Sequence, residues 1–431
     1  MAILFTFGLF LYYWFFLRQH AKAGSTLAML LWLLYVGLGF SGIFIALTNG
    51  IEPIYEPNYL ATLFLLFGVA VSISGFLRFR EQDVSQVFGV IRGQKIIENI
   101  LFFSQLFAMA YFLPFAISSL TGDANENRLF LSEKMELMGS YGLINTAAGA
   151  ASQLFGSSIV LAFIRLASKE SQGRNMLRAF SLLFSSLSYV IYILAYVGRD
   201  GVVYWLMTSV MIFWVFRRHI NPVDARRIYL FGFFCAIALL IPFGVITVSR
   251  FFDADQGAGW SFFEYFGAQI HNFSDYSSID RPLTLGLQSF PMFINAGCSI
   301  LGWDCLSWLD VKDAIFGEYL DQGKAPWLFG TFISDWVGDF GLIGAFLLLS
   351  IFSLFCAKMC SYRGSGNLLS LERLLLMLLL YLVPYWGVFY FRFAISNGYI
   401  VVNLIFILLV RLLHEIIPEV PAVGNVAERG L

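Results

Sequence analysis

Apolar side chains fill repeated runs of about 20 residues along this chain, with shorter polar segments between them. A helix of that length crosses the hydrocarbon core of a bilayer. Eleven runs qualify: Ala2–Leu17, Thr26–Thr48, Tyr59–Leu77, Ile96–Leu120, Leu143–Leu166, Phe180–Val197, Val202–Phe216, Ile228–Val248, Gly338–Ala357, Leu368–Tyr390 and Tyr399–Leu413. We therefore predict an all-α polytopic membrane protein, with about 11 transmembrane helices in one integral membrane domain, residues 1–431.

One long polar segment, residues 250–337, interrupts this pattern between the eighth and ninth spans. Loops of this length usually have a function, and this one carries many acids and tryptophans. Val311, Ile315 and Tyr319 follow Asp310 at helical spacing, with Asp310 as N-cap and Asp313 as the capping-box acid. We expect short amphipathic helices here, the apolar face of this one lying on the membrane. The tryptophans either anchor the loop at the interface or bind a sugar.

Composition agrees with the membrane class. Apolar residues make up 59% of the chain and charged residues 13%, against about 45–50% and 25% in soluble domains. Lysine and arginine gather on one side of the predicted spans, which holds 19 of the 27 basic residues, while most acids lie on the other. By the positive-inside rule, the N-terminus and the long loop are external and the C-terminus is internal.

The first apolar run is followed, not preceded, by the basic residues Arg18 and Lys22. We therefore interpret it as a first span and not as a cleavable signal peptide. Cys298 and Cys305 both fall in the long loop. They either form a disulfide in an oxidising compartment or remain two buried thiols.

Four arginines lie on the external side, where positive charge is scarce. They are Arg199, in a Gly198–Gly201 turn between two spans, Arg250, Arg281 and Arg392. The planar guanidinium group matches phosphate oxygens. A single arginine at a span end is more often an anchor, but the four together predict a diphosphate-binding cluster.

His271, Asp335 and Asp339 are the candidate general bases. His271 is the one external histidine, and its ordinary pKa suits proton transfer. Asp335 and Asp339 are four residues apart and share a face if the ninth span begins early. They are equally the acids that a helix start favours, and His271 equally suits a structural role.

Several signatures are missing from the sequence. It has no Cys/His metal spacing, phosphate-binding glycine loop, Gly-x-Ser-x-Gly elbow or basic nucleic-acid patch. We therefore expect no metal, no cofactor and no nucleic-acid partner. Any donor is then an activated, membrane-bound lipid.

Three segments of the sequence resemble a known family. The first is Gly198-Arg199-Asp200-Gly201. The second is residues 270–273 (Ile-His-Asn-Phe) with 285–290 (Leu-Gly-Leu-Gln-Ser-Phe), and the third is residues 338–344 (Gly-Asp-Phe-Gly-Leu-Ile-Gly) after Phe329-Gly330-Thr331-Phe332. All three are similar to bacterial O-antigen polymerases of the Wzy type. The similarity covers roughly residues 199–344 and the number of spans. The motifs are loose, and residues 338–344 are the most specific.

The resemblance implies a GT-C-like, metal-independent glycosyltransferase in the bacterial inner membrane, with its active site facing the periplasm. Such enzymes take part in lipopolysaccharide biosynthesis. They transfer a glycan en bloc from a polyprenyl (undecaprenyl) diphosphate carrier to a second lipid-linked unit, and a chain-length regulator is an expected partner. The external arginines would bind the diphosphate. Arg199 matches the family pattern best, while Arg250 and Arg281 match it less closely.

Two other functions stay open from the sequence. An O-antigen ligase has similar architecture but transfers the glycan to lipid A core, and the context of His271 fits the polymerase pattern better. A lipid-linked oligosaccharide flippase needs a polar path through the membrane. No ionisable residue lies near the middle of a span, and no internal repeat is visible.

Overall fold

The computed structural model describes most of the chain. Its described residues are 1–22, 24–48, 58–87, 93–121, 142–168, 172–196, 198, 200–230, 232–234, 237, 266–277, 282–304, 306, 308–322, 330–361, 369–394 and 397–416. Within these ranges, all regular structure is helical. This confirms the all-α prediction.

The helices are α1 (Ala2–Tyr12), continued by a π-turn and α2 (Arg18–Lys22), α3 (Thr26–Thr48), α4 (Tyr59–Ser74), α5 (Gln94–Thr121), α8 (Gly142–Gln153), α9 (Phe155–Ala167), α10 (Gln172–Ser186), α11 (Ser188–Ala195), α12 (Asp200–Phe216), α15 (Gln269–Tyr276), α16 (Pro291–Leu301), α17 (Trp308–Asp321), α18 (Thr331–Cys360), α19 (Leu371–Trp386) and α20 (Asn397–Ile416). There are also two 3-10 helices, Glu81–Val87 and Arg392–Ala394, and residues 222–230 are helical as well.

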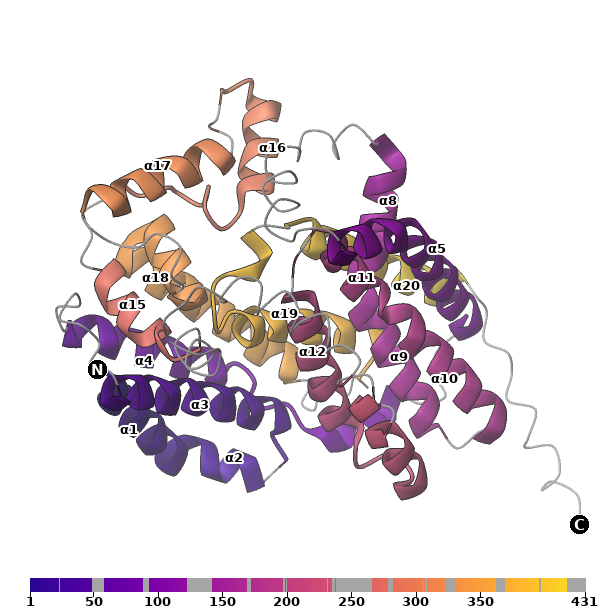
Figure 1. The fold of residues 1–431 in the computed structure, drawn as a ribbon. Helices are drawn as coiled ribbons and strands as arrows, with labels where there is room; N and C mark the ends of the chain where they lie inside the picture. The colour runs from indigo at the N-terminus through magenta and orange to yellow at the C-terminus, as the bar shows by residue number, and fades with distance from the viewer. Residues whose placement is uncertain are drawn as a thin grey trace, which may run out of the picture.

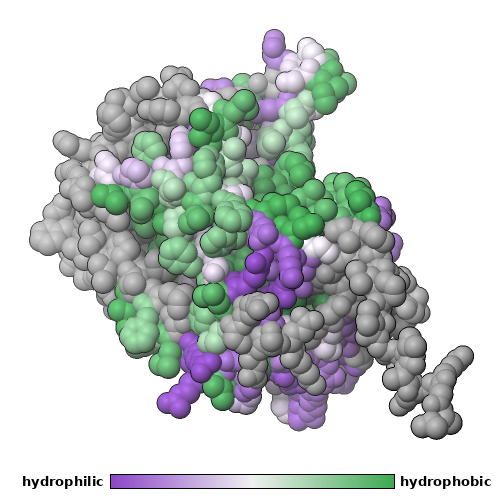
Figure 2. Space-filling view, turned by 90° about the vertical axis from the view of Figure 1, so that its right-hand side faces the viewer, coloured by the Kyte–Doolittle hydropathy of each residue, from purple (hydrophilic) through white to green (hydrophobic). Residues whose placement is uncertain are grey.

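Six described helical segments are long and apolar enough to cross a membrane, or seven if the bent pair α8 and α9 counts as one span. Three further apolar helices, α4, α12 and α16, are shorter. Outward-facing side chains such as Ile351 and Leu354 of α18 are 64% and 71% exposed. Hydrophobic residues cover the upper and middle part of the face in Figure 2, and most hydrophilic ones lie in its lower half. Such a surface suits lipid, so the chain is a membrane protein.

Two groups of helices are joined by a central pair (Figure 1). In one group α1, α3, α4, α15 and α18 pack together; in the other, α5 packs on α8 and α11, and α9 on α10. Between them lie α12 and α19, which contact each other; α12 contacts both groups, and α19 contacts the first group and, through Trp386, Phe155 of α9. Trp386, at the end of α19, is fully buried where the groups meet, among Phe155, Tyr204 and Tyr399.

Local sequence explains several helix ends. Asn58 caps α4 by accepting a hydrogen bond from the Ala61 amide at 3.0 Å. Ser370 caps α19 in the same way. One predicted span, Leu143–Leu166, is bent by 41° between α8 and α9. The Gln153 carbonyl at this bend accepts a hydrogen bond from the side chain of Asn403, which satisfies a group that the bend withdraws from the helix.

The helix predicted after Asp310 exists, but two details were wrong. It begins at Trp308, so Asp310 lies in its first turn and is not the N-cap. Its predicted apolar face, Val311, Ile315 and Tyr319, is buried against protein, on Tyr276 and its neighbours, and does not lie on the membrane. Burial on α15 and the loop after it removes the same apolar area from water that a lipid surface would.

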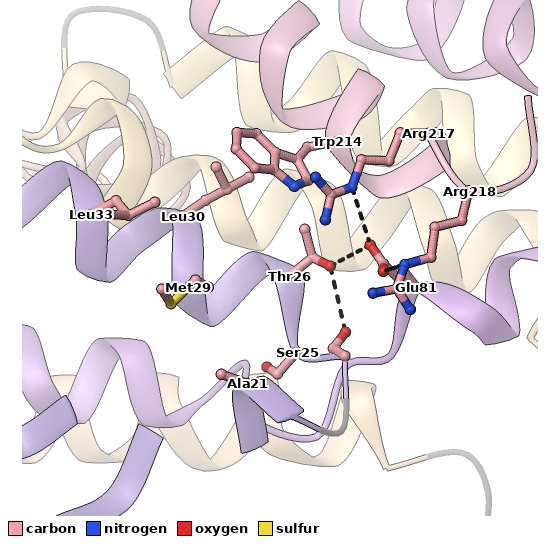
Figure 3. Close-up of a pocket in the computed structure, with 11 residues that line it drawn as sticks. Ala21, Ser25, Thr26, Met29, Leu30, Leu33, Glu81, Trp214, Arg217 and Arg218 are labelled. Carbon is pink, nitrogen blue, oxygen red and sulfur yellow. Dashed lines mark hydrogen bonds and ion pairs between the residues drawn. The ribbon is translucent and has the colours of Figure 1, made fainter. Parts of the chain in front are cut away.

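The loop after α4 meets other connecting segments at one end of the molecule, where Arg78 donates a hydrogen bond to Ser361 and Gln86 accepts one from the Leu369 amide. Glu81 is completely buried there and forms ion pairs with Arg218 and, at 4.0 Å, with Arg217, while Thr26 donates a hydrogen bond to it at 2.5 Å (Figure 3). His219 bonds to the Glu81 carbonyl. These contacts hold the loop after α4 between the start of α3 and the end of α12.

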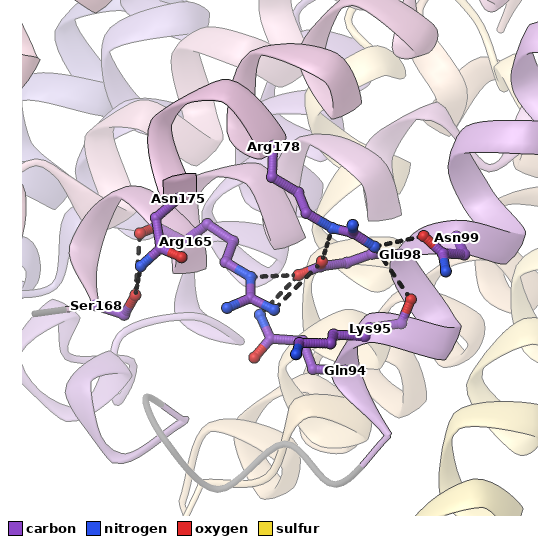
Figure 4. A network of polar contacts seen from close by, with 8 residues as sticks. All are labelled: Gln94, Lys95, Glu98, Asn99, Arg165, Ser168, Asn175 and Arg178. Atoms are coloured by element: carbon purple, nitrogen blue, oxygen red, sulfur yellow. Dashed lines mark hydrogen bonds and ion pairs between the residues drawn. The ribbon is translucent and has the colours of Figure 1, made fainter. Parts of the chain in front are cut away.

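A second buried carboxylate braces the same end. Glu98 of α5 pairs with Arg165 of α9 and Arg178 of α10, both at 2.7 Å (Figure 4). Arg178 also bonds the Lys95 carbonyl and the Asn99 side chain. Two cations and further hydrogen bonds satisfy Glu98, as a buried charge requires.

Candidate functional site

At the opposite end, α18 and the loop before α16 meet around one carboxylate. Asp339 is fully buried. Its Oδ1 accepts hydrogen bonds from the Thr284 hydroxyl (2.5 Å) and from the amides of Gly286 and Gln288 (3.0 Å each), and its Oδ2 accepts one from the Ser289 amide (2.9 Å). The loop of residues 284–289 thus wraps its backbone around the carboxylate. Such charge-assisted bonds are among the stronger polar contacts in proteins.

A break in α18 makes this contact possible. Gly341 has φ 68° and ψ 177° in the middle of the helix, a conformation that essentially only glycine adopts. Thr284 and Leu285 donate their amides to the carbonyls of Gly338 and Asp339. Those two carbonyls lie in the last turn before the break, where a helix leaves its carbonyls unsatisfied.

The loop itself is held in a strained conformation. Leu285 has φ 51° and is followed by Gly286 with φ 96°. Thr331, the first residue of α18, has φ 74°, which is rare for a β-branched residue. Both non-glycine outliers fall in segments that carry the family resemblance. Strain of this kind persists where the surroundings impose it, often at functional sites.

Asp335 connects the same loop to the segment after α19. Its Oδ1 accepts a hydrogen bond from the Gln288 side chain at 2.8 Å and its Oδ2 one from the Phe391 amide at 2.5 Å. Both Asp335 and Asp339 therefore contact Gln288, which confirms that they share one face of a helix that begins early, at Thr331. Asp339 thus binds the backbone of residues 284–289, while Asp335 binds the Gln288 side chain and the Phe391 amide.

Asn397 closes this arrangement from α20. Its amide nitrogen donates to the carbonyls of Ser289 (3.0 Å) and Phe393 (2.6 Å), and its oxygen accepts from the Met292 amide at 3.0 Å. The side chain is buried. The loop before α16, the first half of α18 and residues 387–397 are thus one hydrogen-bonded unit, which we call the outer network.

Arg392 lies at the edge of the outer network and forms an ion pair at 3.0 Å with Asp200, the first residue of α12. Its guanidinium lies over the Tyr204 ring and donates to the Tyr390 hydroxyl at 2.8 Å. The Arg392 side chain is 13% exposed and that of Asp200 35%. Burial opposes the charge of Arg392, but Asp200 and the tyrosines nearby raise its pKa well above the ordinary value. Arg392 stays a cation.

Gly198 and Gly201 pack closely on the end of α11. A Cβ atom on either would come within 2.6 Å of the Ile193 side chain, so both positions need glycine. The ion pair with Arg392 then fixes this tight turn to the outer network. Arg199, the arginine that the turn carries, lies outside the described residues, as do Arg250 and Arg281.

His271 belongs to a different neighbourhood. It is buried in α15 and faces the backbone of Gly42 in α3. Burial lowers the pKa of His271 to about 4, although a backbone hydrogen bond at Gly42 acts in the opposite direction. The ring is therefore uncharged at neutral pH.

A small cavity of about 160 Å³ lies between α15 and α18. Tyr276, Ser277 and Ser334 give it polar groups, and Leu283 and Gly341 bring it next to the break in α18. Hydroxyl and aromatic groups together suit a sugar more than a charged ligand. Among the described residues no group of histidines, cysteines or acids could hold a metal ion.

Sequence reasoning selected the acids of the outer network but missed the groups that bind them. Gln288 and Ser289 were noted only as parts of a motif, Asp200 only as a neighbour of Arg199, and Thr284 and Asn397 not at all. The sequence did offer a signal for Asn397. Its side-chain amide stands at the start of an apolar helix, and a buried amide needs hydrogen-bond partners.

The long loop also contains a covalent link. Cys298 of α16 is disulfide-bonded, whereas Cys356 and Cys360 of α18 are free and buried. Of the two alternatives for Cys298, the structure therefore has the disulfide. Cys305, the partner considered from the sequence, lies outside the described residues.

Comparison with protein-family models, curated proteins and solved structures finds no match to this chain.

Proposed function

We propose that this chain is an O-antigen or related polysaccharide repeat-unit polymerase, with eleven spans in a GT-C-like arrangement. It works in the bacterial inner membrane, with the outer network facing the periplasm. Donor and acceptor are both polyprenyl-diphosphate-linked oligosaccharides. A disulfide at Cys298 supports the periplasmic orientation, because disulfides persist in oxidising compartments.

The contact between residues 284–289 and Asp339 is the observation that carries this proposal. These residues belong to two motifs of the family resemblance that lie about 50 positions apart in the sequence. The third motif, Gly198–Gly201, is tied to the same unit by the Asp200–Arg392 pair. Parts of all three similarities thus fall in one connected region.

In the reaction, an acceptor hydroxyl oxygen bonds to the donor's anomeric carbon while the bond from that carbon to the phosphate oxygen breaks. The hydroxyl proton passes to a base, and the polyprenyl diphosphate leaves with the electron pair. Arg199 is the foremost candidate to stabilise the leaving diphosphate, with Arg250 and Arg281 as further candidates. Arg392 fixes the turn that carries Arg199 through its ion pair with Asp200.

The three candidate bases differ in what their surroundings allow. Asp339 is enclosed by four donors and acts as a positioning residue for the loop of residues 284–289. Asp335 is half-buried, whereas Asp339 is fully buried, so Asp335 is the acid that an acceptor hydroxyl can approach. His271 is uncharged and buried against α3. We therefore place Asp335 first as the base.

The test is the lipopolysaccharide pattern of a host strain that lacks this gene. Complementation with wild type should restore a ladder, and Arg199→Ala at equal expression should leave lipid A core with at most one repeat unit. Arg411→Ala is the matched control, because Arg411 pairs with Glu415 on the exposed surface of α20. We expect it to keep the full ladder.

Two outcomes would contradict the proposal in different ways. Bare core with accumulated lipid-linked polymer in the deletion strain would identify a ligase. A full ladder with Arg199→Ala would leave the polymerase assignment standing but remove Arg199 from the diphosphate site.

A further inference from the structure

We propose that the opposite end of the molecule holds a binding site for an anionic phospholipid, with the head-group phosphate at Arg217 and Arg218 and an acyl chain along α3. A cavity of about 120 Å³ lies there between α3, the loop after α4 and the end of α12 (Figure 3). It can hold a phosphate group but not a whole lipid. The proposal is independent of the function proposed above.

The charges around this cavity favour an anion. Glu81 is completely buried, whereas the side chains of Arg217 and Arg218 are 40% and 49% exposed. Two cations face one carboxylate, so one positive charge is not balanced within the cavity. Both ion pairs run through the Nε atoms of the arginines, and their terminal nitrogens stay available for another acceptor. Arg217 also lies over the ring of Trp214, 4.7 Å from its centroid, which holds the guanidinium in place.

The other wall of the cavity is apolar and continues along α3. Met29, Leu30 and Leu33 line the cavity, and Leu33 is 43% exposed. Phe40 and Phe44 are 54% and 42% exposed, and their spacing from Leu33 puts all three on one side of the helix. The stripe from Leu33 to Phe44 spans about 16 Å at 1.5 Å per residue, which is comparable to an acyl chain.

A cationic pocket that opens onto an apolar helix face matches a phospholipid better than a soluble anion, because a soluble anion gains nothing from the stripe. The pocket is also separate from the outer network. Asp200 begins α12 and Arg217 directly follows its end, and the helix has 17 residues, about 25 Å at 1.5 Å per residue. A lipid donor bound beside the Gly198–Gly201 turn therefore cannot occupy this pocket with the same head group.

Native mass spectrometry of the full chain in detergent tests the proposal, with phosphatidylglycerol and phosphatidylcholine of equal chain length as probes. Wild type should retain phosphatidylglycerol in preference to phosphatidylcholine. Arg217→Gln should weaken phosphatidylglycerol binding about fivefold, because one cation near a lipid surface contributes about that factor, and should leave phosphatidylcholine unchanged. Arg217 is the residue to change because its contact with Glu81 is long, so the buried carboxylate keeps Arg218 and Thr26.

Arg411→Gln is the control, an exposed arginine with its own acidic partner, and it should bind phosphatidylglycerol like wild type. A second variant, Leu33→Ser, leaves every ion pair intact and should also weaken phosphatidylglycerol binding. Equal retention of the two lipids by wild type, or equal losses in Arg217→Gln and Arg411→Gln, would overturn the proposal. So would displacement of the lipid by inorganic phosphate at matched concentration, which would identify a site for free phosphate.

Discussion

The carboxylate of Asp339 is shared by four donors of a loop that lies about 50 residues earlier in the chain. Asparagine has nearly the same shape but one acceptor oxygen in place of two. In Asp339→Asn, an NH₂ group replaces one of the two carboxylate oxygens and faces groups that also donate. Neither of the two facing donors then has an acceptor, and the favourable negative charge of the carboxylate is lost as well.

We therefore expect Asp339→Asn to destabilise the protein by about 2–4 kcal/mol, the range for charge-assisted bonds and the desolvation of orphaned donors. The matched control is Asp224→Asn, since Asp224 pairs with Arg227 across one helical turn at the surface and should contribute less than about 1 kcal/mol. The unfolding midpoint in detergent measures both. Equal midpoints for the two variants would contradict the role of Asp339.

The sequence predicted that Asp335 and Asp339 share a helix face, because their spacing of four is a local property. It could not predict what they bind. Most of their partners are backbone amides, which nearly every residue has, and nothing in the sequence marks those of Gly286, Ser289 or Phe391. The pairing of Arg392 with Asp200 was missed for a similar reason, since Arg199 was the nearer partner in the sequence.

At the scale of helices, the break at Gly341 decides the shape of α18. Alanine at this position would have to adopt φ near 68°, at a cost of about 1–3 kcal/mol, or the helix would straighten. A straight helix would take back the carbonyls of Gly338 and Asp339 that bind the loop. We expect Gly341→Ala to lower the unfolding midpoint and to reduce polymer formation.

Gly317→Ala provides the comparison for Gly341→Ala. Gly317 is inside α17, and a Cβ there meets nothing within 4 Å. Alanine should be neutral or stabilising by up to about 1 kcal/mol. A Gly341→Ala protein as stable and active as Gly317→Ala would show that the break does not matter.

The apolar runs predicted the helices well, because length and hydropathy alone decide whether a segment can span a bilayer. Ten of the eleven predicted spans contain a described apolar helix or helix pair, and most of the eighth lies outside the described residues. The bends at Leu154 and Gly341 could not be predicted. Glycine and small residues are common in membrane helices, where they usually serve close packing, so their presence does not mark a break.

For the whole molecule, the two polar ends carry different chemistry, and their orientation is testable. Asp321, at the end of α17, and Arg226, just beyond α12, are both exposed. In intact cells, a membrane-impermeant maleimide that reaches the periplasm should label Asp321→Cys and should label Arg226→Cys only after the inner membrane is permeabilised. Wild type measures the background from its own cysteines. The reverse pattern would invert the topology.

The break in α18 also sets the depth of the outer network. Residues 342–360 follow Gly341 in α18 and are about 28 Å long as a helix, close to the thickness of a hydrocarbon core. If residues 342–360 span the hydrocarbon core, residues 331–340, with Asp335 and Asp339, lie at the level of the lipid head groups. A thicker or thinner bilayer would move that boundary or tilt the helix. Hydrophobic mismatch would therefore act on the outer network through the position of a single glycine.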